Sequence, residues 1–356
     1  MKLFTVGPVE MDECTCRIGA QRLPYFRTPS FSRLMFECED WLKELSGADA
    51  ASRAGILTAA GSAAMESAVI NMFTADDEVL IINGGGFGQR FVDICRVHEI
   101  PFREVKLAFG EALTAAHLER AHRSSLTGLL VNIHETTTGQ LYPIDLLSSF
   151  CRQHELIFLV DAISSLFADS YHMSRWGVDV TICSSHKALA LPPALSFVVL
   201  SERACERVMG IQPPTLYLNL RDHLLNMERG QTPFTPAVGV VLQLHDKLKR
   251  IREVGLDTYR AGIRDNATYF RRAIADLPYA VPTYPLSVAL TPVCCPRHNA
   301  RHLYETAMEE DGIVLTPSGG ALRDQLLRVG HLGALRPVDY DAVLKFLARQ
   351  EGGVYA

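Results

Sequence analysis

Short apolar runs recur through the first two-thirds of the chain, and each stops at small or polar residues. Such runs are typical of strands that are buried on both faces of a sheet. Strands are therefore predicted at residues 79–82, 129–133, 156–160, 178–182 and 196–200. Helical patterns lie between them, for example at 63–73, with Ser62 as the N-cap, and at 145–155. The alternation predicts an α/β fold with a mainly parallel sheet sandwiched by helices.

The alternation stops near residues 211–240, where prolines and glycines interrupt the pattern. A long helix with charged faces is predicted at about 238–254. The sequence pattern of residues 255–350 is typical of a smaller α+β domain. A chain of 356 residues is long enough for two domains of ordinary size. We therefore expect a large domain at 1–245 and a small C-terminal domain at 246–356.

Net charge and the positions of the cysteines indicate which partners, compartments and metal sites are not expected. The 35 lysines and arginines against 40 aspartates and glutamates give a net charge of −5 without a dense basic run, so we expect no nucleic-acid or membrane-surface partner. The nine cysteines form no disulfide framework and predict an intracellular, cytoplasmic protein. No signal peptide and no membrane span are expected. Cys14–Cys16 and Cys294–Cys295 lack a second pair at zinc spacing, so no metal site is expected either.

Two loops of small residues lie where a strand would lead into a helix. Residues 84–90 are rich in glycine, but from either Gly84 or Gly86 they lack the last glycine of a dinucleotide-binding motif. This loop is either a tight turn or a turn that places Phe87 against a ligand. The loop at 58–64 could offer backbone N–H groups and a helix N-terminus to an anion, although a plain capping turn has the same composition.

Two ionisable residues follow neighbouring predicted strands. Asp161 comes directly after the strand at 156–160, and Lys187 follows the strand at 178–182 after a short polar turn. Ligands of open α/β sheets bind at the carboxyl ends of the strands. A lysine among small apolar residues has a lowered pKa, and its neutral amine can form a Schiff base. A solvent-facing lysine and a carboxylate that caps a helix are the ordinary alternatives.

The segments Val160-Asp161-Ala-Ile-Ser-Ser165 and Ser184-Ser-His-Lys187 resemble motifs of the class V aminotransferases, in the fold-type I superfamily of pyridoxal-phosphate enzymes. The similarity runs from Val6-Gly7-Pro8 to Leu327-Arg328-Val329-Gly330, with the motifs in the family's order. The most similar branch holds alanine–glyoxylate, serine–pyruvate and 2-aminoethylphosphonate–pyruvate aminotransferases. The resemblance implies the fold-type I architecture and pyridoxal 5'-phosphate as cofactor. It also implies that the N-terminal segment, residues 1–15, lies near the small domain.

The resemblance assigns roles to individual residues. It implies that Lys187 is the Schiff-base lysine and that Asp161 pairs with the pyridine nitrogen of the cofactor. It implies further cofactor contacts in the phosphate-binding turn, on both faces of the ring, near the phenolic oxygen and directly before the lysine: Gly61, Ser62, Ala63, Phe87, Thr137, Ile163 and His186. Thr232 and Thr235 match a segment that reaches the phosphate site of a neighbouring subunit, which implies a homodimer with shared active sites.

The resemblance also points to substrate contacts. Arg328 matches an arginine that holds the substrate α-carboxylate, for which the guanidinium fork is well shaped. Gly7 and Arg27 match segments that lie near the substrate. Phe26 precedes Arg27 where relatives often have histidine, and this departure leaves the amino donor and the acceptor open.

These matches imply a ping-pong transfer of an amino group from a small amino acid or amine to a keto acid such as pyruvate or glyoxylate. Lys187 would move the proton as general base and acid. One alternative is an enzyme specific for 2-aminoethylphosphonate and pyruvate. Another is a pyridoxal-phosphate-dependent desulfurase or lyase, with Cys294 or Cys295 as the nucleophile. A third is a non-catalytic binding protein, against which the retained Lys187, Asp161 and Arg328 argue.

Overall fold

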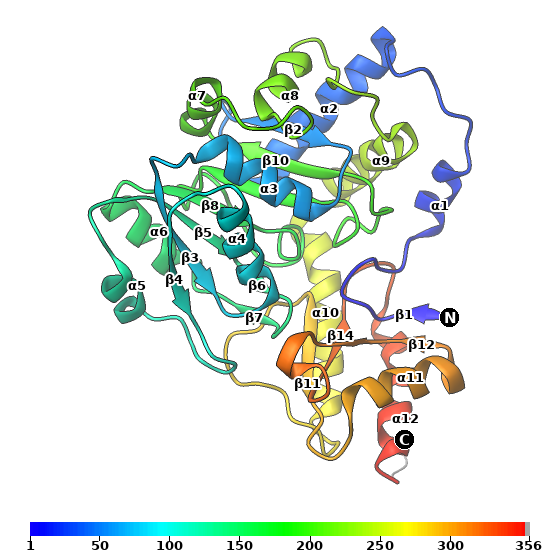
Figure 1. Ribbon diagram of the computed structural model, residues 1–356. Coiled ribbons are helices and arrows are strands. Elements are labelled where there is room, and N and C mark those ends of the chain that lie inside the picture. The colour runs from blue at the N-terminus through cyan, green and yellow to red at the C-terminus, as the bar shows by residue number, and fades with distance from the viewer. Residues whose placement is uncertain (353–356) are drawn as a thin grey trace.

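The computed structural model describes residues 1–352, and within them the main sheet has seven strands in the order β2-β10-β9-β8-β5-β3-β4. The strands are β2 (Arg53–Leu57), β3 (Glu78–Asn83), β4 (Phe102–Lys106), β5 (Leu126–Asn132), β8 (Ile157–Asp161), β9 (Val180–Ser184) and β10 (Ser196–Leu200). Neighbours from β9 to β4 pair in parallel, whereas β10 runs antiparallel to β9 and β2. The predicted mainly parallel sheet is confirmed, and all five predicted strands are present (Figure 1).

Alternate residues of each strand enter two hydrophobic cores on opposite faces of the sheet. On β8, Phe158 and Val160 belong to one core, and Ile157 and Leu159 belong to the other. The first core is covered by α2 (Pro29–Ser46), α6 (Ile144–Gln153) and α9 (Val238–Val254), and the second by α3 (Gly61–Met72), α4 (Gly86–Val97), α7 (Glu202–Gly210) and α8 (Leu220–Met227). Burial on both faces explains why these strands are continuous apolar runs.

The C-terminal third has a hydrophobic core of its own, to which the start of the chain contributes Phe4. Its antiparallel sheet has the order β11 (Leu290–Cys294), β14 (Leu326–Gly330) and β13 (Thr316–Pro317), and its helices are α10 (Leu256–Ile274), α11 (Ala300–Asp311) and α12 (Tyr340–Gln350). β1 (Lys2–Leu3) pairs in parallel with β12 (Ile313–Val314), so the N-terminus lies beside the C-terminal elements (Figure 1).

The remaining elements connect these parts. They are α1 (Glu13–Gly19), α5 (Ala115–Ala121), the hairpin of β6 (His134–Glu135) and β7 (Gln140–Leu141), and the 3-10 helices Gly320–Leu322 and Pro337–Asp339. None of the helices within residues 1–352 is both long and apolar enough to cross a membrane.

Two local features differ from the sequence-based expectations. The prediction of Ser62 as an N-cap is wrong: α3 begins at Gly61 behind an extended Ala60, and the Ser62 hydroxyl accepts a hydrogen bond from Arg90 Nη1 at 2.8 Å. The strands β2 and β4 were not predicted. Both lie at the edges of the sheet, and β4 mixes apolar and charged residues because it is less buried than the central strands.

Candidate active site

Polar residues meet at the carboxyl ends of the parallel strands. β8 ends in Asp161, and β9 leads through a short turn to Lys187. β3 leads into the glycine-rich start of α4, and β5 continues into His134–Glu135. The chain passes from β3 to its neighbour β4 on one side of the sheet, and from β5 to its neighbour β8 on the other side. Open α/β sheets bind ligands at the point where the direction of these connections reverses.

Lys187 is almost completely buried, with 7% of its surface exposed. Its Nζ donates a hydrogen bond to the carbonyl of Val6 at 2.6 Å. Burial and then the charge of Arg328 lower the pKa of Lys187 to about 8, against the opposing charge of Asp161. A Cβ at Gly7, where φ is +127°, would lie 2.7 Å from Cδ and Nζ of the lysine. Only glycine therefore lets the N-terminal segment pass so close to the amine.

Asp161 is buried at the end of β8, and its Oδ1 accepts a hydrogen bond from Ile163 N at 2.8 Å. Burial raises the pKa of Asp161 to about 7, although this hydrogen bond and the charge of Lys187 lower it. The Ile163 side chain lies against the first turn of α3, where a Cβ at Gly61 would be 2.7 Å from Ile163 Cδ1. Because burial disfavours the ionised form of Asp161, a cation at its other carboxylate oxygen, Oδ2, would stabilise that form.

Phe87, Arg90 and Ser62 lie together at the starts of α3 and α4. The Arg90 guanidinium lies over the Phe87 ring, with its carbon 4.9 Å from the ring centroid, and it also binds Ser62. His186 Nδ1 lies 2.9 Å from Ser184 Oγ, and burial followed by the charge of Lys187 lowers the pKa of His186 to about 4. A guanidinium beside a helix N-terminus attracts an anion, and the exposed face of an aromatic ring can stack on a planar ligand.

Glu135 organises this region, and sequence reasoning missed it. The fully buried carboxylate accepts hydrogen bonds from Phe87 N and Gly88 N at 3.2 Å and from Thr137 N and Asn132 Nδ2 at 3.0 Å. A Cβ at Gly85 would lie 2.6 Å from Glu135 Cδ, so the glycine allows the start of α4 to approach the carboxylate. The position of Glu135 just after a buried strand was the signal that could have found it.

Several buried polar atoms near Lys187 have no hydrogen-bond partner among residues 1–352: both ring nitrogens of His134, Oγ1 of Thr136 and Nε of Arg328. Buried polar groups are nearly always paired, so these atoms indicate the place of a ligand or water. Burial lowers the pKa of His134 to about 3, which keeps the imidazole neutral. The Thr137 hydroxyl, by contrast, already accepts a hydrogen bond from Gly86 N at 3.0 Å. Sequence reasoning missed both His134 and Thr136.

Arg328 comes from β14 in the C-terminal third and spans the two parts of the chain. Its Nη1 donates to Thr136 O at 2.9 Å, and its Nη2 donates to Pro317 O at 2.7 Å. Burial lowers the pKa of Arg328 to about 10, whereas the charge of Glu135 raises it, so the guanidinium stays charged at neutral pH. Two carbonyls thus fix its orientation beside the lysine and the carboxylate.

Three further residues expected at the site, Arg27, Thr232 and Thr235, belong to two segments that contact each other. Arg27 is exposed, and its Nη1 donates to Gln231 Oε1 at 2.8 Å. Thr232 Oγ1 donates to Phe234 O at 2.6 Å, and Thr235 is exposed. The structure therefore brings Arg27 together with the segment that holds the two threonines.

The two adjacent cysteines are poorly suited to nucleophilic chemistry. Cys294 ends β11, and Cys295 follows it with 6% of its surface exposed. Burial raises the pKa of both thiols, that of Cys295 to about 12. Because the thiolate is the reactive form, neither residue is activated at neutral pH.

Comparisons with known proteins identify the family of the chain. The family model for aminotransferase class-V matches residues 26–320. The 2-aminoethylphosphonate–pyruvate transaminase 2 of Paraburkholderia xenovorans is 30% identical over 78% of this chain and 77% of its own length. A protein named soluble hydrogenase 42 kDa subunit, from Anabaena cylindrica, is 27% identical over 94% of this chain and 88% of its own length. The crystal structure of pyridoxamine–pyruvate aminotransferase from Mesorhizobium loti covers 99% of this chain and 92% of its own at 23% identity, with a TM-score of 0.92.

The chain therefore belongs to the class V aminotransferases, which are pyridoxal-phosphate-dependent enzymes of fold-type I. The fold class and the family inferred from the motifs around Asp161 and Lys187 are both confirmed.

Proposed function

We propose that the protein transfers an amino group from a small amino acid or amine to a keto acid such as pyruvate, with Lys187 as the residue that handles the proton. The observation that carries this proposal is one buried site in which an amine of lowered pKa lies near a carboxylate of raised pKa and a fixed guanidinium. Such opposed pKa shifts are typical of acid–base catalysis. The name of the relative from Paraburkholderia xenovorans also includes pyruvate as a substrate.

The residues of the site fit pyridoxal phosphate. Asp161 offers a buried carboxylate to a protonated pyridine nitrogen, and Phe87 and Ile163 offer two faces to a flat ring. The start of α3, from Gly61 to Ala63, and the Arg90–Ser62 pair suit a phosphate. The unpaired Thr136 hydroxyl and the Thr137 hydroxyl, which accepts from Gly86 N and keeps its own proton to donate, are both candidates for the phenolic oxygen. His186 stays the candidate for a further phosphate contact.

The chemistry divides between the cofactor and this chain. Bound here, pyridoxal phosphate would supply an aldehyde for the amines and a ring that withdraws electrons from the substrate Cα. The neutral amine of Lys187, available because its pKa is near 8, takes the Cα proton and redelivers it. Asp161 keeps the ring nitrogen protonated, and Arg328 holds the substrate carboxylate. The neutral His134 ring can donate to a substrate oxygen or accept from a substrate N–H.

Replacing Arg328 with lysine is expected to raise the KM for the keto acid about ten- to a hundredfold and to change kcat much less. Lysine keeps the charge but cannot bind both a carboxylate and the two carbonyls that now hold the guanidinium. Steady-state kinetics with pyruvate test this, and Arg323→Lys, an exposed position nearby in the sequence, is the matched control. A kcat loss at unchanged KM would assign Arg328 to the chemical step instead.

An amine panel tests the proposed function directly. The purified holoprotein is mixed with L-alanine, L-serine, L-aspartate, 2-aminoethylphosphonate or L-cysteine, and the visible absorbance of the cofactor is followed. We expect at least one amine to bleach the band and pyruvate to restore it. Sulfide release from L-cysteine would instead support the desulfurase alternative, which the raised thiol pKa values of Cys294 and Cys295 disfavour. A band that no amine bleaches would support a binding protein.

We further propose a cytoplasmic homodimer in which Thr232, Thr235 and Arg27 face the partner's site. Exposed apolar side chains occur close by: Tyr25 is two residues before Arg27, and Leu216 is next to Tyr217, whose ring stacks on Phe234. Light scattering is expected to give about twice the chain mass of 39.4 kDa. A monomer with full activity would contradict shared active sites.

The division into two domains stays a prediction. The packing of α9 suggests a different residue for the boundary between them. The end of α9 carries Leu248 and Ile251, which belong to the core of the main sheet. We therefore propose that the small domain starts near Gly255, between α9 and α10, instead of at residue 246. Arg328 lies within this domain and would follow its movements.

A further inference from the structure

Residues 4–10, which we term the strap, run from the C-terminal core to the main sheet. Phe4 is buried in the C-terminal core, and its carbonyl accepts a hydrogen bond from Gly330 N at 2.7 Å. Val9 is buried in the core of the main sheet. Between these two anchors, the carbonyl of Val6 accepts the hydrogen bond from the amine of Lys187. The strap thus determines where the main acceptor of the lysine amine lies.

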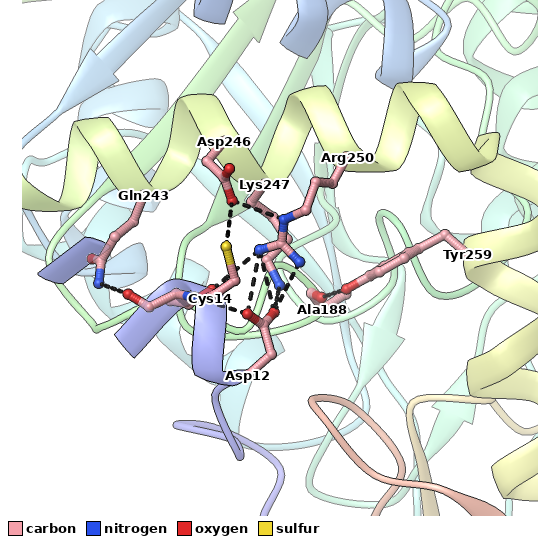
Figure 2. A network of polar contacts seen from close by, with 9 residues as sticks. Asp12, Cys14, Ala188, Gln243, Asp246, Lys247, Arg250 and Tyr259 are labelled. Atoms are coloured by element: carbon pink, nitrogen blue, oxygen red, sulfur yellow. Dashed lines mark hydrogen bonds and ion pairs between the residues drawn. The ribbon is translucent and has the colours of Figure 1, made fainter. Parts of the chain in front are cut away.

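The end of the strap, Glu10, accepts a hydrogen bond from Ala334 N at 2.9 Å, and two residues further on Asp12 ties the chain to α9. It is the N-cap of α1, where its Oδ1 accepts a hydrogen bond from Thr15 N at 2.8 Å, and it forms ion pairs with Lys247 and Arg250 (Figure 2). Burial would raise the pKa of Asp12, but the hydrogen bonds from Lys247 and Thr15 N hold it well below its usual range. The Lys247 side chain is only 4% exposed, so its ammonium depends on Asp12 for compensation.

Tyr259 of α10 lies near these residues and contacts the loop of Lys187. The hydroxyl of Tyr259 donates to the carbonyl of Ala188, and Figure 2 shows this pair beside Asp12 and Arg250. Arg250 is held in turn by Asp246, whose Oδ2 lies 2.8 Å from Arg250 Nε. Asp12, Asp246, Lys247 and Arg250 thus form a cluster of two anions and two cations, and Tyr259 and Ala188 lie near it in Figure 2.

We propose that Asp12 is a positioning residue for Lys187. Its pairs with Lys247 and Arg250 hold the strap so that the Val6 carbonyl keeps the lysine amine in one place. The proposal rests on the proposed function, because a held amine matters only if the lysine moves a proton. None of the catalytic groups touches Asp12 itself.

The physical consequence concerns the proton-transfer step. In each turnover the amine of Lys187 must be free, and a free lysine side chain has many rotamers. The Val6 carbonyl selects one of them, so a loosened strap spreads the amine over positions that are less suited to reaching the substrate Cα. A displacement of about 1 Å can cost on the order of a hundredfold in rate. Binding of the substrate carboxylate at Arg328 does not involve the cluster and is expected to stay unchanged.

The test uses Asp12→Asn in the holoprotein. Asparagine keeps the N-cap acceptor for Thr15 N and removes the charge that binds α9. The donor is the amine that bleaches the cofactor fastest in the panel above, with hydrogen or deuterium at Cα. We expect kcat to fall about tenfold or more, KM to stay within about twofold, and the deuterium isotope effect on kcat to rise, because proton transfer becomes slower relative to the other steps.

Two further variants distinguish positioning from folding. Lys247→Met keeps a straight buried chain without the charge and is expected to raise the isotope effect in the same way. Glu253→Gln removes an exposed carboxylate of α9 that pairs with Lys249 and belongs to neither the cluster nor the site, and it is expected to keep the wild-type kcat and isotope effect. A lower melting temperature with an unchanged isotope effect in both Asp12→Asn and Lys247→Met would overturn the inference. A wild-type protein that reacts with no amine would overturn the proposed function itself.

Discussion

Lys187→Ala is expected to lower amino transfer by about a thousandfold or more while the protein stays folded. General acid–base catalysis alone contributes about 10²–10⁴-fold, and the variant also loses the amine that binds the cofactor aldehyde. The loss should be specific to this amine, because within residues 1–352 Lys187 is the lysine whose charge acts on Asp161 and His134. Product formation at saturating substrate measures the loss, and the melting temperature reports the fold.

Lys249→Ala is the matched control for this change. Its ammonium is on α9 and its side chain is 59% exposed, so its removal should leave turnover unchanged. In the wild type, steps that need the neutral amine are expected to speed up as pH rises through about 8, the pKa of Lys187. Near-normal turnover of Lys187→Ala would refute the assigned role.

Asp161→Asn is expected to lower kcat about a hundredfold, because a neutral amide cannot hold the proton on the pyridine nitrogen as the carboxylate does. The variant should also bind the cofactor more weakly. Asp145→Asn, which replaces a carboxylate that binds Trp176 Nε1, controls for the loss of a structural carboxylate. Unchanged kcat with saturating cofactor would contradict the role of Asp161.

The same variant should change how stability depends on pH. The pKa of Asp161 is about 7 in the folded protein and near 3.8 when unfolded, so without cofactor the folded state binds the proton more tightly. Stability is therefore lost as pH rises from about 4 to about 7, by on the order of 4 kcal/mol, whereas the amide of the variant has no proton to lose in this range. We expect the melting temperature of the cofactor-free wild type to fall relative to Asp161→Asn between pH 5 and pH 8. If the difference in melting temperature between the two proteins did not change with pH, ionisation of Asp161 would cost the folded state no stability, which would contradict the raised pKa.

Much of the fold could be predicted because burial on both faces leaves a clear pattern. The central strands, such as β5 and β8, read as apolar runs, and the family motifs around Asp161 and Lys187 could be placed at their carboxyl ends. The edge strand β4 could not, since it is only partly buried and mixes apolar with charged residues, and β2 could not, since only Ile56 and Leu57 of its five residues are large and apolar. The start of α3 was misplaced because Ser62 suits an N-cap by type, whereas its hydroxyl binds Arg90.

The parts of the site that sequence reasoning missed depend on contacts between distant segments. Glu135 binds the backbone of α4, and Asp12 binds α9 more than two hundred residues away. Periodicity and capping rules describe neighbours along the chain, so they carry no information on such pairs. Thr136 is a similar case, because only the packing shows that its buried hydroxyl has no partner within residues 1–352.

The central claim is that Lys187 holds the cofactor and moves the proton. Borohydride reduction of the purified holoprotein, followed by proteolysis and mass spectrometry, tests the attachment most directly. We predict one modified peptide, with the pyridoxyl group on Lys187, and loss of both the visible band and amino transfer. A pyridoxyl group on another lysine, or full activity after reduction, would contradict the account.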